Sequence, residues 1–199
     1  MNAETDRLIG VATRLYAELG YDWTSMRMIA DAAGVDLERL TRLVGEKPEL
    51  YQEVMVRAVK AEREVMGQAL RSAGPGLQGA LDLVDAYLDF NVAHPEYLAL
   101  WLHRWTGDAT DTPDMEDIYT RPLVTEVVEA VRGLLPADVN GHHLVWTIVW
   151  CVYGFLSGGM RNVSPDWPQK QGERAGPAVV EDFRAYLHTL VRRMTMPLT

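Results

Sequence analysis

Cysteine is almost absent from this sequence. Cys151 is the single cysteine among 199 residues. One thiol cannot form an intramolecular disulfide and cannot supply the thiolates of a cysteine-based zinc site. The first residues, MNAETDRLIG, carry acids where a secretory signal peptide carries lysines, and no apolar stretch follows them. We therefore expect a cytoplasmic protein.

Positive charge is also in short supply. The chain has 19 Lys and Arg residues against 28 Asp and Glu residues, a formal net charge of -9. This charge repels phosphate unless cations gather locally, so a histone-like polybasic binder is excluded. Residues 1–60 hold 8 basic and 10 acidic side chains, and residues 61–199 hold 11 and 18. The first segment is nearly neutral, and the second is strongly acidic.

Long hydrophobic runs are scarce. Residues 144–160 form an uncharged run of 17 residues. A membrane-spanning helix needs about 20 apolar residues, and Gly154 and Gly158 lower the hydrophobicity of this run further. We expect a helix that is buried on all sides by its own domain and by a partner, with no membrane contact.

Signatures of catalysis are missing as well. The sequence has no G-x-S-x-G elbow, no phosphate-binding P-loop and no dinucleotide fingerprint. His142 and His143 are adjacent, so on a helix they point in different directions and cannot form a metal pair. The sequence thus predicts neither an enzyme nor a cofactor or metal site.

Apolar residues recur with helical spacing along almost the whole chain, and no stretch shows the alternation of a β-strand. The pattern predicts an all-α protein of about nine helices. The first should end at Gly20, and the others should span about 25–32, 36–44, 46–71, 76–93, 95–106, 115–135, 139–161 and 177–194. Pro122 should bend or split its helix, and residues 164–176 form the longest loop.

The two short helices near residues 25–32 and 36–44 have the layout of a helix-turn-helix. Ala33-Gly34-Val35 joins them, and Gly34 permits the tight turn. Ile29, Leu37 and Leu40 are expected to interlock beneath that turn.

The run GYDWTSMRMIADAAGVDLERLTRLVGEKPELY, from Gly20 to Tyr51, resembles the DNA-binding domain of the TetR family of transcriptional regulators. The shared elements are Gly20-Tyr21, Thr24-Ser25, Ile29-Ala30, Ala32-Ala33-Gly34-Val35, Leu40 and Lys47-Pro48-Glu49-Leu50. The resemblance implies a helix-turn-helix DNA-binding domain at residues 1–48 and a helical ligand-binding and dimerisation domain at 49–199. It further implies a homodimeric repressor that binds a palindromic double-stranded operator and leaves it when a small-molecule effector binds.

The expected recognition helix departs from the family pattern. Glu38 stands where the family commonly has a small residue, and Thr41 replaces a tyrosine that usually contacts phosphate. These departures favour an alternative: a helical small-molecule sensor or interaction protein that kept the fold and lost operator binding. A third reading is an all-helical enzyme with a buried apolar active site, which should depend on a polar group such as His103.

A phosphate site is predicted at the start of the second helix. Thr24 is a good N-cap residue, yet Arg27 stands three residues on, where a capping box has Glu. A cation in the first turn opposes the helix dipole and costs about 0.3–1 kcal/mol. The presence of a cation at this position is explained if a DNA phosphate normally binds there. The alternative is a solvated arginine whose stem covers apolar surface.

Arg39 and Arg42 are the candidates to reach guanine or the DNA backbone, and Glu38 is positioned to accept from a cytosine amino group. Alternatively, Asp36 and Glu38 only stabilise the helix N-terminus. Lys47 matches the family lysine that contacts phosphate. The predicted DNA contacts are Thr24, Ser25, Arg27, Asp36, Glu38, Arg39, Thr41, Arg42 and Lys47.

An excess of aromatic residues on the later helices predicts an apolar or aromatic effector. Asn91 and His103 are the polar groups expected to orient it. The alternative is that these aromatic side chains are plain core. The predicted effector contacts are Tyr87, Phe90, Asn91, Trp101, His103, Trp105, Trp146, Trp150 and Tyr153.

A dimer interface is predicted on the last two helices, through which the family dimerises. Gly154 and Gly158 have the G-x-x-x-G spacing that lets another helix approach closely. The alternative is that Gly158 merely ends its helix. The predicted interface residues are Gly154, Gly158, Phe183, Leu187, Leu190 and Val191.

Overall fold

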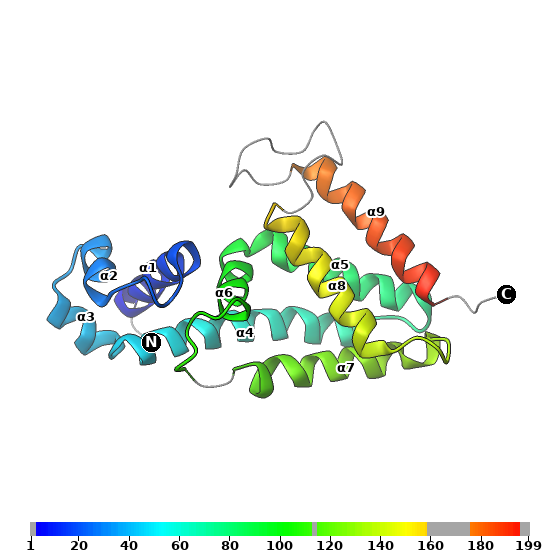
Figure 1. Ribbon diagram of the computed structural model, residues 1–199, viewed down its shortest axis with the longest axis horizontal. Helices are drawn as coiled ribbons and strands as arrows, with labels where there is room; N and C mark the ends of the chain where they lie inside the picture. Colours follow the sequence, from blue (N-terminus) through cyan, green and yellow to red (C-terminus); the bar gives the residue numbers. More distant parts are fainter. Residues whose placement is uncertain (1–2, 113–114, 159–175, 196–199) are drawn as a thin grey trace. The chain divides into compact units, whose positions relative to one another are not determined.

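The computed structural model describes residues 3–112, 115–158 and 176–195 (Figure 1). Most of these residues lie in helices, and none of them lies in a β-strand. The α-helices are α1 (Ala3–Leu19), α2 (Met26–Ala33), α3 (Leu37–Val44), α4 (Lys47–Ser72), α5 (Leu77–Ala93), α6 (Pro95–Trp105), α7 (Arg121–Val131), α8 (Gly141–Leu156) and α9 (Pro177–Met194). The all-α prediction is therefore confirmed.

The chain folds into two compact units. The first comprises residues 1–61 and 94–115, and the second comprises residues 62–93 and 116–199. The long helix α4 contributes to both units, and α6 belongs to the first. The division into functional domains at residue 48 remains a prediction.

The first unit is built on α1, which packs against α2, α3 and α6. Leu8 of α1, Ile29 of α2 and Leu40 of α3 are fully buried, which fixes the three N-terminal helices around one core. Gly34 follows α2 with φ 67°, the left-handed conformation that the turn requires. The prediction that Leu37 joins this core is wrong, because its side chain is 37% exposed at the first residue of α3.

The second unit has a core between α5, α8 and α9. Phe155 of α8 stacks on Phe183 of α9 with ring centroids 3.8 Å apart. Leu88, Val152 and Leu187 are fully buried in the same cluster. Burial of this apolar surface holds the three helices together.

The helix bounds mostly follow the spacing and breaks in the sequence. Pro122 splits its helix as predicted: a π-helical turn at Glu116–Thr120 precedes α7, in which Pro122 occupies the first turn. The helix expected to end near residue 161 ends at Leu156, since Gly158 adopts φ 89°. The loop predicted at 164–176 lies outside the described residues except for its last position.

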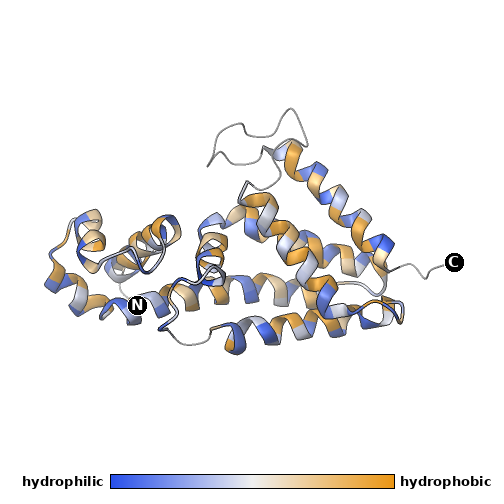
Figure 2. Ribbon diagram, in the orientation of Figure 1, coloured by the Kyte–Doolittle hydropathy of each residue, from blue (hydrophilic) through white to orange (hydrophobic). Residues whose placement is uncertain are grey.

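The mainly hydrophobic α8 (Figure 2) is the helix of the longest uncharged run. No helix among the described residues combines the length and hydrophobicity needed to cross a bilayer.

Candidate nucleic-acid interface and effector site

The N-terminus of α2 is an exposed, acid-free helix end. Ser25 is the N-cap, and its hydroxyl oxygen accepts a hydrogen bond from the Met28 amide at 3.2 Å. Arg27 is exposed in the first turn, which contains no acidic residue, and no ion pair within the described residues engages it. Free amides, a helix dipole and a cation therefore coincide at one surface, a combination that binds anions.

Thr24 does not have the predicted role. Its side chain is 1% exposed, and its hydroxyl donates to the Gly20 carbonyl oxygen at 2.7 Å. The predicted N-cap was therefore one residue early, because α2 begins at Met26 and Ser25, with an extended backbone, caps it. Of the residues predicted to contact phosphate at this helix end, Ser25 and Arg27 are exposed.

Helix α3 presents a polar face above a buried anchor. Asp36 is its N-cap, and the carboxylate accepts from the Arg39 amide at 2.7 Å, so this acid stabilises the helix end as the alternative reading expected. Leu40 is fully buried, whereas Glu38 and Arg42 are exposed and Thr41 is partly buried. Because Leu40 holds α3 against the core, the Arg42 side chain lies on the solvent-exposed side of the helix.

Arg39 is already engaged within the first unit. Its guanidinium donates to both carboxylate oxygens of Glu4 on α1, with each hydrogen bond 2.9 Å long. Hydrogen bonding to Arg39 lowers the pKa of Glu4, so the acid stays ionised. DNA contact by Arg39 would require phosphate or a base to replace this carboxylate. Arg42 has no such competitor among the described residues.

Lys47 begins α4 and lies over the ring of Tyr21, with Nζ 4.2 Å from the ring centroid. The ring restrains the ammonium group without neutralising it. Lys47 thus keeps the positive charge that a phosphate contact needs.

Asp108, in the segment after α6, is bonded to the loop between α1 and α2. Its carboxylate accepts hydrogen bonds from the backbone amides of Tyr21 at 2.6 Å and Asp22 at 2.8 Å. Gly20 leaves room for this contact, since a Cβ there would lie 3.2 Å from Asp108 Oδ2 and φ is 81°. These bonds join the α6 end of the chain to the helix-turn-helix within the first unit.

The predicted effector contacts are divided between the two units. Trp101, His103 and Trp105 lie on α6 in the first unit, where α6 packs against α1. The His103 ring nitrogen is hydrogen-bonded to the Ala17 carbonyl oxygen at 3.2 Å, so its contacts connect two helices and give no support for an effector role. The second unit contains Tyr87, Phe90, Asn91, Trp146, Trp150 and Tyr153.

Sequence reasoning missed a partly buried acid, Glu62 on α4. Tyr87 on α5 and Tyr153 on α8 interact electrostatically with its carboxyl group, and these three residues are called the polar cluster below. The Tyr87 and Tyr153 hydroxyls are hydrogen-bonded to each other, and the Asn91 amide donates to the Tyr87 carbonyl oxygen at 2.8 Å. Burial raises the pKa of Glu62 to about 7 and those of both phenols well above their ordinary range.

A sequence signal for Glu62 did exist. It lies four residues after the buried Ala58 and four before the buried Met66, on the apolar stripe of α4. An acid on such a stripe interrupts the apolar spacing. Because α4 carries many other charged residues, this one acid did not stand out in the sequence.

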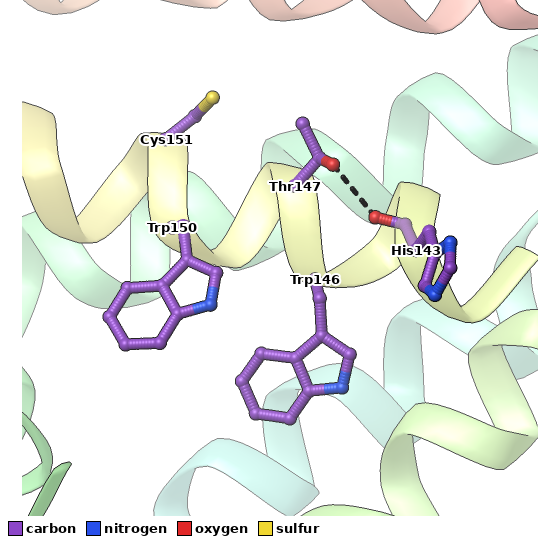
Figure 3. Close-up of a pocket in the computed structure, with 5 residues that line it drawn as sticks. All are labelled: His143, Trp146, Thr147, Trp150 and Cys151. Atoms are coloured by element: carbon purple, nitrogen blue, oxygen red, sulfur yellow. Dashed lines mark hydrogen bonds between the residues drawn. The ribbon is translucent and has the colours of Figure 1, made fainter.

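A separate groove of about 500 Å³ lies along α8, lined by His143, Trp146, Thr147, Trp150 and Cys151 (Figure 3). The rings of Trp146 and Trp150 extend from the same side of the helix, with centroids 6.3 Å apart. Trp150 is 50% exposed, whereas Tyr153 on the same helix is buried. The half-exposed Trp150 therefore lines this groove, and the buried Tyr153 is not among its lining residues.

No protein-family model matches this sequence, and no curated protein sequence matches it. Solved structures do match. The ketosteroid transcriptional regulator KstR2 of Mycobacterium tuberculosis is similar with a TM-score of 0.73 and 17% identity, over 99% of this chain and 97% of that one. The TetR family transcriptional regulator PfmR from Thermus thermophilus has a TM-score of 0.66 and 21% identity, over the whole of both chains. AibR, solved with isovaleryl coenzyme A and operator DNA, has a TM-score of 0.66 and 16% identity, over 98% and 100%.

The chain has the TetR-family fold. At these identities the likeness establishes the arrangement of helices, and the α2–α3 motif occupies the position that the resemblance in residues 20–51 implied.

Several residues predicted to form the dimer interface are buried within the second unit. Phe183, Leu187 and Val191 are at most 4% exposed, because they pack into the core of the second unit. Gly154 has open space where a Cβ would stand, and Gly158 lies in the turn after α8. Leu190 is partly buried against the same core. The large aromatic side chains exposed on these helices are instead Trp150 and Tyr186.

No group of three or more His, Cys, Asp or Glu side chains with metal-binding geometry occurs in the described ranges. Burial raises the pKa of the Cys151 thiol, which disfavours the reactive thiolate.

Proposed function

We propose that this protein is a ligand-responsive transcriptional regulator, a repressor that binds a palindromic operator as a homodimer and is released by a small-molecule effector. The observation that carries the proposal is the exposed pair of cations on the helix-turn-helix, Arg27 and Arg42. Both stand on a nearly neutral segment of an otherwise acidic chain. In such a protein, base contacts from a correctly spaced dimer must supply affinity that net charge cannot.

Effector binding is proposed for the second unit and operator binding for the first. The helix α4 runs through both units, so a change in its direction would alter the separation of two recognition helices in a dimer. Successive major grooves repeat about every 34 Å, so a displacement of a few ångströms would spoil the fit. Asp108 and the α6 segment would hold the helix-turn-helix in place as this occurs.

The homodimer is proposed to form through the outer faces of α8 and α9, with Trp150 and Tyr186 as contacts. Each ring is about half exposed in the single chain. An exposed apolar patch of this kind is typical of an interface. Trp150→Arg should convert the dimer to monomer in sedimentation analysis, whereas Val92→Arg, at another exposed apolar position in the same unit, should not.

The test of operator binding begins with the purified protein and fragmented genomic DNA. Selection should enrich fragments that share a palindromic sequence, and fluorescence anisotropy should then give salt-sensitive binding to that sequence. Arg71→Ala removes an exposed charge from the second unit and should leave binding unchanged. Absence of any enriched sequence at all salt concentrations would contradict the proposal.

One observation favours a second candidate function, a helical sensor that no longer binds an operator. Arg39 is held by Glu4, and Asp36 and Glu38 add negative charge to the same helix. This candidate predicts a stable dimer that binds small molecules and shows no preference among DNA sequences.

A further inference from the structure

Trp23 is the most exposed of the large apolar side chains in the described part of the chain, with 83% of its surface open to solvent. It lies in the turn between α1 and α2, and no hydrogen bond or ring contact within the described residues engages its indole. Single exposed apolar residues are common on protein surfaces. The meaning of this one therefore depends on how its backbone is held and on what surrounds it.

The backbone on both sides of Trp23 is fixed. The Asp22 amide donates to the carboxylate of Asp108 at 2.8 Å. The Thr24 amide donates to the Tyr21 carbonyl oxygen at 3.1 Å, which closes a four-residue turn with Trp23 inside it. The Thr24 side chain is itself buried. Because the backbone is already ordered, a surface that covers the indole restricts only the torsions of that one side chain.

Cations stand on both sides of this turn. Before Trp23, the ring of Tyr21 holds Lys47, whose Nζ lies 4.2 Å from the ring centroid. After Trp23 comes Ser25, the N-cap of α2, with Arg27 exposed in the first turn of the helix. Trp23 and Ser25 are two residues apart, so their Cα atoms lie within about 7 Å of each other. The indole therefore borders the helix end where phosphate binding is proposed.

These surroundings favour the DNA backbone as the occupant. A DNA strand alternates anionic phosphates with deoxyribose, and proteins use both to fix their position on the duplex. An apolar ring between two cations matches this alternation. The indole N–H adds a hydrogen-bond donor for a phosphate oxygen. Asp22 is the only acid among the four residues of the turn, so the contact gains little from net charge here and depends on the ring.

We infer that Trp23 packs against a deoxyribose of the DNA backbone, beside the phosphate at the N-terminus of α2, and thereby positions the helix-turn-helix on the duplex. The inference rests on the proposed function, because it names a contact surface of the operator complex. The DNA contacts predicted from the sequence all have polar or charged side chains. Trp23 adds an apolar contact that carries no sequence information.

The test measures fluorescence anisotropy with two duplexes, the sequence recovered by selection and a scrambled version, over a range of salt concentrations. Trp23→Ala should lower the affinity for both duplexes about tenfold, because a large apolar surface is no longer covered. The ratio of operator to scrambled affinity should stay the same, since sugar contacts do not read bases. Trp23→Phe keeps an aromatic ring and should retain most of the affinity.

Two further variants separate the ring from charge and from general loss of apolar surface. Arg27→Ala should also weaken binding, and it should flatten the slope of log affinity against log salt by about one phosphate contact per copy. Trp23→Ala should leave that slope unchanged, because it removes no cation. Ile118→Ala shortens an exposed apolar side chain of the second unit and should bind both duplexes as wild type does.

A second readout follows the indole itself. The difference in fluorescence between wild type and Trp23→Phe isolates the emission of Trp23. Acrylamide should quench this emission readily in the free protein, and the scrambled duplex at low salt should protect it. Protection that increases with protein concentration in the absence of DNA would assign the ring to a protein contact and would overturn the inference.

The remaining outcomes separate this inference from the proposed function. Unchanged affinity or a flatter salt slope in Trp23→Ala, or an indole that stays open to acrylamide in the complex, would overturn the backbone contact. A changed ratio of operator to scrambled affinity in that variant would overturn it as well. With operator binding by the wild type intact, each of these results leaves the proposed function standing. Failure of the wild type to bind either duplex would overturn both.

Discussion

The helix-turn-helix of the first unit and the polar cluster of the second unit each contain a charge without a partner. Arg42 is exposed on α3, where water solvates the guanidinium and no opposite charge is needed. Glu62 faces Tyr87 and Tyr153, and burial raises its pKa to about 7. An unpaired charge such as that of Arg42 thus costs little at the surface. For Glu62 in the second unit, burial favours the protonated, neutral form of the carboxyl group.

The largest expected effect concerns Glu62 and stability. The pKa of about 7 in the folded chain exceeds the ordinary value of 4.5, so the folded state holds an additional proton between these pH values. This contribution to stability is complete below 4.5 and is lost as pH rises through 7. At about pH 8, Glu62→Gln should therefore be more stable than wild type by up to about 3 kcal/mol, and the difference should shrink near pH 5.

Urea unfolding of both proteins at the two pH values measures this difference. Glu64→Gln should show none of it, since that side chain is exposed. A constant difference across the pH range would mean that Glu62 is as well solvated as Arg42, and the contrast between the units would disappear.

A smaller effect is expected at Asp108 in the first unit. Asp108→Ala removes the acceptor for the Tyr21 and Asp22 amides and should destabilise this unit by about 1–2 kcal/mol. Hydrogen exchange at these two amides should accelerate while exchange at the second unit's core stays slow. Asp111→Ala, an exposed acid nearby, is the control. Unchanged exchange would show that the carboxylate does not hold the loop.

The smallest effect is expected at Glu4. Glu4→Gln should release Arg39 and raise DNA affinity a few-fold at low salt, because the carboxylate no longer competes with phosphate. The slope of log affinity against log salt should steepen by about one phosphate contact. Affinity that is the same in Glu4→Gln and wild type would show that Arg39 does not reach DNA.

The sequence predicted the first unit better than the second, for physical reasons. Local rules govern α2 and α3: a capping residue, a glycine in the turn and two buried apolar positions, Ile29 and Leu40. Even there, the N-cap is Ser25 and not Thr24, whose hydroxyl is bonded to the Gly20 carbonyl oxygen instead. The exposure of Leu37 depended on how α3 is turned toward α1, and local spacing does not determine that.

In the second unit, function depends on which face of each helix points inward. Helix α8 is apolar on every side, so its sequence alone could not separate the buried Tyr153 from the exposed Trp150. Phe183 and Leu187 were assigned to an interface for the same reason, although α9 buries them in its own core. The surroundings of Glu62 depend on tyrosines from α5 and α8, and the spacing of residues along α4 does not specify them.

The most direct test of operator recognition is the discrimination between operator and scrambled DNA by wild type and Arg42→Ala, measured by anisotropy over a range of salt concentrations. If Arg42 reads a base, the variant should lose about 1–3 kcal/mol of specific binding while its binding to scrambled DNA changes little. An unchanged ratio of operator to scrambled affinity in Arg42→Ala would contradict the role given to α3.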